Sequence, residues 1–191
     1  MKDVSKPKLI IFEGIATSGK TTTISNLISH LQEKHQITFV SEEETTVPLF
    51  ENRDPLKAVE YLKNVIENIK KISTSYIIVE RLFITHAFRT NSKLNIFSGL
   101  ENEVLNCFDP ITILLRMQDD YISNRIELAD KQRGATWKHK KVGTLEERVN
   151  YYIEQQKYLK KLFSESAMPI FSIDTSRMDW DNVLNIILKN I

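Results

Sequence analysis

Cysteine is nearly absent from this chain of 191 residues, which contains only Cys107. A single thiol excludes an internal disulfide and is typical of a reducing compartment, so we expect a cytoplasmic protein. No apolar run is long enough to cross a bilayer, and residues 1–7 lack the apolar region of a signal peptide. We therefore expect no membrane partner.

The chain also lacks an excess of positive or negative charge. Lysine and arginine number 26 against 25 acidic residues, which gives a net charge of +1. Without a basic excess, we expect no nucleic-acid partner. The four histidines show no spacing of metal ligands. A hydrophobic content of 41% over this length predicts one globular domain, residues 1–191.

Glycine is scarce, and two of the five glycines lie in the segment GIATSGKT, residues 14–21. This segment matches the phosphate-binding P-loop pattern G-x-x-x-x-G-K-[ST] at every fixed position. The apolar, β-branched run of residues 8–13 predicts a buried parallel strand before it, and apolar residues at helical spacing predict a helix over residues 21–35. A glycine turn without a ligand is the alternative, but the strand, loop and helix together predict binding of a nucleoside triphosphate.

The chemistry of this loop follows from its residue types. Gly14 and Gly19 let the chain curl so that successive backbone N–H groups point at a phosphate, and the helix directs its positive N-terminal end at the same anion. Lys20 supplies a mobile charge for the outer phosphates, and the Thr21 hydroxyl can ligate Mg²⁺. The predicted ATP-binding residues are Gly14, Ala16, Thr17, Ser18, Gly19, Lys20, Thr21 and Thr22.

Three consecutive glutamates follow the second predicted strand, residues 35–40. Ligands gather at the carboxyl ends of strands in open α/β sheets, so this cluster is a candidate for contact with a second substrate. We assign Glu43 as a catalytic carboxylate and Glu42 and Glu44 as acceptor contacts, although the sequence does not decide which of the three acts. A solvated acidic loop is the alternative.

An acid and an arginine end the third predicted strand, residues 76–80. Four apolar residues closed by Glu80 have the Walker-B form, which brings a carboxylate close to Mg²⁺. Arg81 is a fixed cation beside it, and a structural ion pair is the alternative. A helix over residues 82–90 is expected to expose His86 and Arg89 as acceptor contacts. Residues 91–98 are expected to be a loop and residues 99–108 a helix, across the mouth of the site.

A basic segment with two glycines, residues 131–143, lies between two predicted helices. The first begins at residues 119–120 and is expected to bury Tyr121, and the second begins at Thr144 with a capping box. The segment predicts a mobile lid over phosphates, and a charged surface loop is the alternative. Arg125 and Arg133 are the predicted catalytic cations, because a guanidinium matches phosphate geometry.

Strands and helices alternate along the whole chain. Further helices are predicted over residues 54–72 and from residue 179, and further strands over residues 111–115 and 169–174. This order predicts an α/β protein with the three-layer P-loop kinase fold, in which helices cover both faces of a five-stranded parallel sheet. The chain lacks the Asn-Lys-x-Asp motif expected of a GTPase, so a kinase with a small acceptor is favoured.

The motifs together resemble the thymidylate kinase and deoxynucleoside kinase group of P-loop kinases. The resemblance covers nearly the whole chain and rests on residues 12–22, on Glu80-Arg81 followed by Phe83 and Phe88, on residues 109–115 and 121–125, on residues 146–149 with Tyr151 or Tyr152, and on residues 168–174. It implies transfer of the ATP γ-phosphate, with Mg²⁺, to a nucleoside or a nucleoside monophosphate.

Three departures from the group bear on the acceptor. Ala16 occupies the position of the acid that thymidylate kinases carry in the P-loop, residues 43–46 replace their Glu-Pro-Gly-Gly segment, and Leu82 replaces the serine of deoxynucleoside kinases. The glutamates favour a hydroxyl acceptor, whereas the arginines favour a phosphate. A monophosphate acceptor is preferred because more of the chain resembles thymidylate kinases. A deoxynucleoside kinase and a non-catalytic nucleotide-binding regulatory module are the alternatives, and apolar helix faces at residues 54–72 and 100–108 could form a homodimer.

Overall fold

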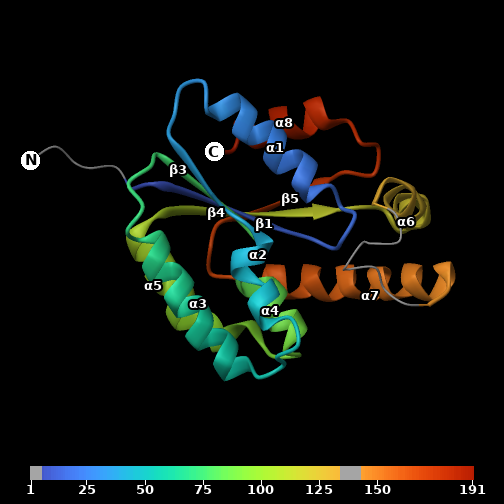
Figure 1. Ribbon diagram of the computed structural model, residues 1–191, viewed down its shortest axis with the longest axis horizontal. Coiled ribbons are helices and arrows are strands. Elements are labelled where there is room, and N and C mark those ends of the chain that lie inside the picture. The colour runs from blue at the N-terminus through green and yellow to red at the C-terminus, as the bar shows by residue number, and fades with distance from the viewer. Residues whose placement is uncertain (1–5, 134–142) are drawn as a thin grey trace, which may run out of the picture.

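The computed structural model of the chain describes residues 6–133 and 143–191. Five strands form one sheet in the order β2-β3-β1-β4-β5, and every neighbouring pair is parallel, which confirms the predicted fold (Figure 1). The strands are β1 (Lys8–Glu13), β2 (Ile37–Val40), β3 (Tyr76–Glu80), β4 (Asp109–Arg116) and β5 (Ile170–Asp174).

Helices cover both faces of this sheet. The helices are α1 (Lys20–Leu31), α2 (Glu42–Thr45), α3 (Pro55–Ile69), α4 (Phe83–Arg89), α5 (Ser98–Cys107), α6 (Asp119–Arg133), α7 (Leu145–Ser164) and α8 (Trp180–Leu188), with the 3₁₀ helices η1 (Val47–Leu49) and η2 (Leu94–Phe97). Figure 1 shows α1 and α8 on one face and α3, α4, α5 and α7 on the other. The result is a three-layer α/β arrangement.

The central strand β1 is buried on both sides. Leu9 and Ile11 point into the core under α3, α4 and α7, whereas Ile10 and Phe12 point into the core under α1 and α8. A strand alternates its side chains between two faces, so an unbroken apolar run is what two covered faces require. The loop that follows β1 therefore starts from the most rigid part of the sheet.

The structure corrects two predictions about local structure and adds one short helix that was not predicted. Residues 91–98 are not an irregular loop, because they contain η2 and the start of α5. The glutamates after β2 form the short helix α2, which a capping box between Ser41 and Glu44 stabilises; at four residues it is too short to show helical periodicity. Tyr121 is exposed rather than buried.

The surfaces expected to form a dimer contribute to the protein's own core. The apolar face of α3, including Leu62 and Ile66, is buried, as are Leu100 and Val104 of α5. The homodimer thus stays a prediction. These two helices do not offer an exposed apolar face that would support it. No helix within the described parts of the chain has the length and apolar character needed to cross a membrane.

Candidate active site

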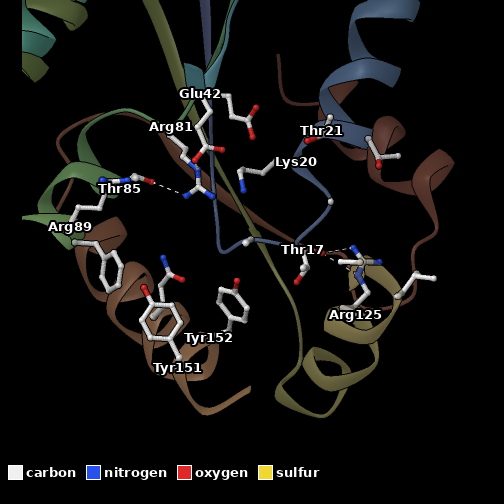
Figure 2. A pocket seen from close by; sticks show the side chains of 18 of the residues that line it. Thr17, Lys20, Thr21, Glu42, Arg81, Thr85, Arg89, Arg125, Tyr151 and Tyr152 are labelled. Atoms are coloured by element: carbon white, nitrogen blue, oxygen red, sulfur yellow. Dashed lines mark hydrogen bonds and ion pairs between the residues drawn. The ribbon is translucent and has the colours of Figure 1, made fainter. Parts of the chain in front are cut away.

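A cavity of about 290 Å³ opens at the carboxyl edge of the sheet. Its wall combines the loop after β1, the ends of β2 and β3, and side chains of α4, α6 and α7, so residues far apart in sequence meet there (Figure 2). Ligands bind at this edge in open parallel sheets. We call the part beside the P-loop, Arg125 and Trp180 the donor half, and the part beside α2, Arg81, Arg89 and Tyr151 the acceptor half.

Both glycines of the P-loop have backbone conformations that favour glycine. Gly14 has φ 144°, and a Cβ there would lie 2.5 Å from the carbonyl oxygen of Leu115. Gly19 has φ 90°, and its Cβ would lie 2.3 Å from Cη2 of Trp180. The Thr175 hydroxyl also donates to the carbonyl of Ser18 at 2.8 Å. The loop is thus held against β4 and against the segment that leads into α8.

Lys20 is a buried cation at the base of the donor half, 5% exposed. Its Nζ donates to the carbonyl oxygens of Gly14 at 3.2 Å and Ile15 at 3.1 Å. Burial, followed by the nearby charge of Arg81, lowers the pKa of Lys20 to about 8. An anion in the cavity would compensate this cost of burial, so the site favours a negatively charged ligand.

Other buried polar atoms of the donor half lack a hydrogen-bond partner among the described residues. The buried hydroxyl of Thr17 has no hydrogen-bond partner in the described protein, and neither does Nη1 of Arg125; both residues line the cavity. The other nitrogens of Arg125 donate to the carbonyl of Thr17, at 3.1 Å from Nε and 2.8 Å from Nη2, and its guanidinium lies 5.3 Å from the ring centroid of Trp180. Unsatisfied buried polar groups are costly, so phosphate oxygens are fitting partners.

Glu42 and Arg81 form an ion pair at the centre of the cavity, with 2.8 Å between Oε1 and Nε. The side chain of Arg81 also donates from Nη1 to Gly14 O at 3.2 Å and to Thr85 Oγ1 at 3.4 Å. Its backbone has φ 62°, a left-handed conformation that a non-glycine residue adopts at a cost of about 1–3 kcal/mol. Figure 2 shows Glu42 and Arg81 beside Lys20. A carboxylate and two cations therefore share the place where donor and acceptor halves meet.

The helix α2 holds Glu42 in this position through bonds to three other elements. The Thr45 hydroxyl donates to the carbonyl of Glu80 at 2.7 Å, and Tyr61 donates to the carbonyl of Glu44 at 2.6 Å. Nε2 of His86 lies 2.9 Å from the Thr45 carbonyl oxygen. His86 is buried, 1% exposed, so the expectation of an exposed acceptor contact is wrong, and burial lowers its pKa to about 4. A neutral His86 fixes α2 from behind.

Glu13 is a positioning residue that the sequence analysis did not single out. Its buried carboxylate accepts from the backbone N–H of Leu82 at 2.8 Å and of Thr85 at 3.3 Å, and from the Thr85 hydroxyl. Burial raises the pKa of Glu13, while the bonds from Thr85 and Leu82 act against that shift. An acid that ends a buried strand directly before a P-loop was the available signal, because a buried carboxylate needs donors. Through these bonds, β1 fixes the start of α4 and hence Arg81.

The outer end of the acceptor half contains two further arginines. Arg89 donates from Nη2 to the carbonyls of Leu49, at 3.2 Å, and Phe50, and its guanidinium lies 4.5 Å from the ring centroid of Phe50. Nη1 of Arg53 donates to the Arg89 carbonyl at 2.8 Å. Burial, followed by the charges of Arg53 and Arg81, lowers the pKa of Arg89. Positive charge is therefore concentrated at this end.

The structure brings most of the predicted site residues to one cavity. Those that line it are Ala16, Thr17, Gly19, Lys20, Thr21, Thr22, Glu42, Glu80, Arg81, Arg89 and Arg125. Gly14 and Ser18 lie buried behind the loop, whereas Glu43 and Glu44 are exposed outside the cavity. The sequence reasoning gave no site role to several lining residues, namely Phe50, Arg53, Thr85, Gln132, Gln155, Met178 and Trp180. They come from segments whose sequences carry no phosphate-binding pattern.

The predicted lid, residues 131–143, lies largely outside the described residues. The helix α6 continues to Arg133, so the first three residues of the predicted lid are helical, and the side chain of Arg133 lies outside the description. Arg148 of α7 pairs with Asp130 of α6 at 2.8 Å, and burial of Arg148 strengthens this contact. The two helices that flank residues 134–142 are therefore tied to each other.

The donor set for a metal ion fits Mg²⁺. The Thr21 hydroxyl and the Glu80 carboxylate line the same cavity and are oxygen ligands. Within the described parts of the chain, no three or more His, Cys, Asp or Glu side chains gather as a metal cage. Mg²⁺ suits such a sparse set, because it takes most of its ligands from water and substrate phosphates.

Comparison with known proteins places the fold. No protein-family model matches the chain, and no curated protein matches its sequence. Among solved structures, YorR protein of Bacillus subtilis in complex with phosphorylated GDP is similar at 15% identity and a TM-score of 0.64, over 95% of this chain and 94% of that one. Thymidylate kinase of Candida albicans is similar at 15% identity and a TM-score of 0.56, over 97% and 92%.

A third similar structure is deoxyadenosine kinase of M. mycoides with the products dCMP and dCDP. It has 16% identity and a TM-score of 0.54, over 95% of this chain and 97% of that one. These likenesses, at low identity, show the fold alone: the chain shares its three-layer α/β arrangement around a five-stranded parallel sheet with these structures. They do not show the reaction, which has to be inferred from the residues of the cavity.

Proposed function

We propose that the protein is an ATP-dependent kinase that phosphorylates a hydroxyl group of a nucleoside or nucleotide-like acceptor. The observation that carries this proposal is the Glu42–Arg81 pair, 2.8 Å apart, in the cavity that also contains Lys20. A hydroxyl acceptor needs a carboxylate to accept its proton, whereas a phosphate acceptor is already ionised and is repelled by one. The sequence alone favoured a monophosphate acceptor; the position of Glu42 reverses that preference.

The residues have separable roles in this reaction. Lys20 and the P-loop amides hold the β- and γ-phosphates, and Thr21 and Glu80 are the residues that would hold Mg²⁺, which neutralises charge on those phosphates when bound. The acceptor oxygen forms a bond to the γ-phosphorus as the bond from that phosphorus to the β–γ bridging oxygen breaks. The hydroxyl proton passes to Glu42, and ADP leaves. Arg81 lies close enough to offset the charge that spreads over the transferring group.

A nucleoside monophosphate acceptor is the second candidate. The arginines Arg53, Arg81 and Arg89 in the acceptor half favour it, because each can bind phosphate. The two candidates give chemically different products, since transfer to a monophosphate creates a phosphoanhydride and transfer to a hydroxyl creates a phosphomonoester. A non-catalytic nucleotide-binding module is the third candidate function. Binding of ATP without transfer of a phosphoryl group to any acceptor would support it.

The test compares Glu42→Gln with Glu43→Gln, using radiolabelled ATP and a panel of nucleosides and nucleoside monophosphates. Glutamine keeps the size of the side chain but accepts no proton, so Glu42→Gln should reduce kcat about 10²–10⁴-fold while ATP binding persists. Glu43 lies outside the cavity, and its variant should stay within about twofold of the wild type. Equal losses in both variants, or unchanged turnover in Glu42→Gln, would remove the proposal.

A further inference from the structure

Arg53 and Arg89 lie at the outer end of the cavity, where the proposed transfer step gives them no role. The hydrogen bonds described for both guanidiniums go to backbone carbonyl oxygens, of Arg89 in the first case and of Leu49 and Phe50 in the second. Within the described residues, neither forms an ion pair with a carboxylate, and Nε of Arg89 is buried without a partner. Two neighbouring cations thus lack a direct ion-pair partner in the described parts of the chain, although the charge of Glu42 also acts on Arg89.

The cost of this arrangement without a ligand falls on Arg89, which is partly buried, whereas Arg53 is exposed to solvent. Like charges repel, and the guanidinium of Arg89 also loses water by burial, as the direction of its pKa shift indicates. Attraction to the C-terminal end of α4 accounts for one cation there, because Arg89 is in the last turn of that helix. It does not account for Arg53, which lies on a different segment and still faces the same cavity.

Arg89 lies on α4 beyond the residue that Arg81 contacts. Thr85, which accepts a hydrogen bond from Arg81, lies on α4 one turn before Arg89. One helical turn advances about 5.4 Å, so the backbone of Arg89 is displaced by roughly that distance along α4 from the backbone of Thr85. Figure 2 shows the same order, with Arg89 on the far side of Thr85 from Lys20. Arg89 therefore contacts the cavity from a position further along α4 than the residue that contacts Arg81.

We propose that the acceptor carries two groups, a hydroxyl that is phosphorylated at Glu42 and an anionic group, such as a phosphate, that Arg53 and Arg89 bind at the other end. This inference rests on the proposed function and adds the substrate class. It reconciles the carboxylate with the arginines, because each acts on a different end of one molecule. Phe50 and Tyr151 also line the cavity. A nucleoside that already bears a phosphate on its other hydroxyl has this form.

The test measures binding and product structure separately. Adenosine, guanosine, cytidine and thymidine are titrated calorimetrically into the protein saturated with a non-hydrolysable ATP analogue, each beside its 3′- and 5′-monophosphate. A monophosphate should bind at least tenfold more tightly than its parent nucleoside, because hydrogen bonds to charged groups contribute about 1.5–3 kcal/mol. ³¹P NMR of the turnover mixture then distinguishes a product with two separate phosphomonoesters from a phosphoanhydride.

Variants assign the preference to the two arginines. Arg53→Met and Arg89→Met should each reduce the ratio of monophosphate to nucleoside affinity by about tenfold, and Lys57→Met, which removes an exposed charge of α3 outside the cavity, should leave it unchanged. The ratio of the two affinities distinguishes a specific effect from a general loss of stability, because misfolding would weaken the binding of nucleoside and monophosphate alike. Arg53→Met serves if Arg89→Met fails to fold.

The outcomes separate this inference from the proposed function. Equal affinity for nucleosides and monophosphates, or a ratio that both arginine variants leave unchanged, overturns the inference even if a hydroxyl is phosphorylated. A phosphoanhydride product overturns it together with the hydroxyl acceptor. Tight binding of a monophosphate that depends on Arg53, without turnover of any acceptor, supports the anion site and contradicts the kinase instead.

Discussion

The two halves of the cavity are built in different ways. In the donor half, one continuous segment, residues 14–22, supplies most of the lining, and glycine backbones set its shape. In the acceptor half, Glu42, Arg53, Arg81, Arg89 and Tyr151 come from separate segments, and side-chain hydrogen bonds hold them. The donor half thus depends on local conformation, whereas the acceptor half depends on tertiary contacts. Mutations should therefore damage the first by changing the backbone or its charge and the second by loosening contacts.

The largest expected effect belongs to the donor half. Lys20→Ala removes the cation that would lie against the outer phosphates and should reduce phosphoryl transfer about 10³-fold, since one well-placed electrostatic group contributes on that order. Lys34→Ala changes an exposed lysine beyond the end of α1 and should keep wild-type activity. Radiolabelled transfer from ATP measures both. Turnover of Lys20→Ala equal to that of the wild type would disprove the assignment of the donor half.

A methyl group added to the P-loop should be the next most damaging change. Gly19→Ala combines a positive φ with a Cβ 2.3 Å from the Trp180 ring, so it should destabilise the protein by about 2–4 kcal/mol and weaken ATP binding. Gly99→Ala is the matched control, because nothing lies within 4 Å of its Cβ in α5. That variant should be slightly more stable than the wild type. Urea denaturation checks both, and a harmless Gly19→Ala would contradict the packing against Trp180.

The acceptor half can be loosened without touching its charges. Thr45→Val deletes the bond to the Glu80 carbonyl that anchors α2, and should cost about 1–2 kcal/mol of stability. Because Glu42 is on that helix, kcat should fall about tenfold while the KM for ATP stays unchanged. Thr45→Ser keeps the hydroxyl and should restore kcat. A rise in the KM for ATP instead would mean that the two halves are not independent.

The smallest effect concerns pH. With a pKa of about 8, Lys20 is positively charged below pH 8 and loses its proton above it in the ligand-free protein. Since the charged form binds phosphate, ATP affinity should be constant below pH 7 and fall by up to about tenfold between pH 8 and pH 9. Lys20→Arg keeps its charge over this range and should bind with little dependence on pH. Titrations with ATP at fixed ionic strength test this, and a flat wild-type profile contradicts the buried charge.

The sequence predicted the donor half well for a physical reason. A loop that binds phosphate through its backbone needs glycine at fixed positions, and such a requirement is visible in consecutive residues. The same holds for the sheet, because strands buried on both faces are continuous apolar runs, as in β1 and β4. Residues 14–22 and the buried strands β1, β3 and β4 were found in this way, whereas β2 and β5 are only partly buried.

The acceptor half could not be predicted to the same degree. Glu42, Glu43 and Glu44 are alike in sequence, and only the turn of α2, fixed by Thr45 and Tyr61, decides which one faces the cavity. His86 was expected to be exposed on the helix after Arg81, but it is buried and its Nε2 lies 2.9 Å from the Thr45 carbonyl oxygen of α2. Such distinctions depend on which element packs against which. This packing cannot be read from the neighbouring residues in the sequence.

The contacts of the P-loop with the segment before α8 have a consequence for the time course of synthesis. The Ser18 carbonyl receives its hydrogen bond from Thr175, which lies 157 residues later in the chain, and the ring over Gly19 belongs to Trp180. At about 5–20 residues per second, a ribosome needs roughly 8–30 seconds to travel that distance. Throughout this interval the nascent protein carries the complete P-loop sequence, but the groups that hold the Ser18 carbonyl and pack against Gly19 have not yet been synthesised.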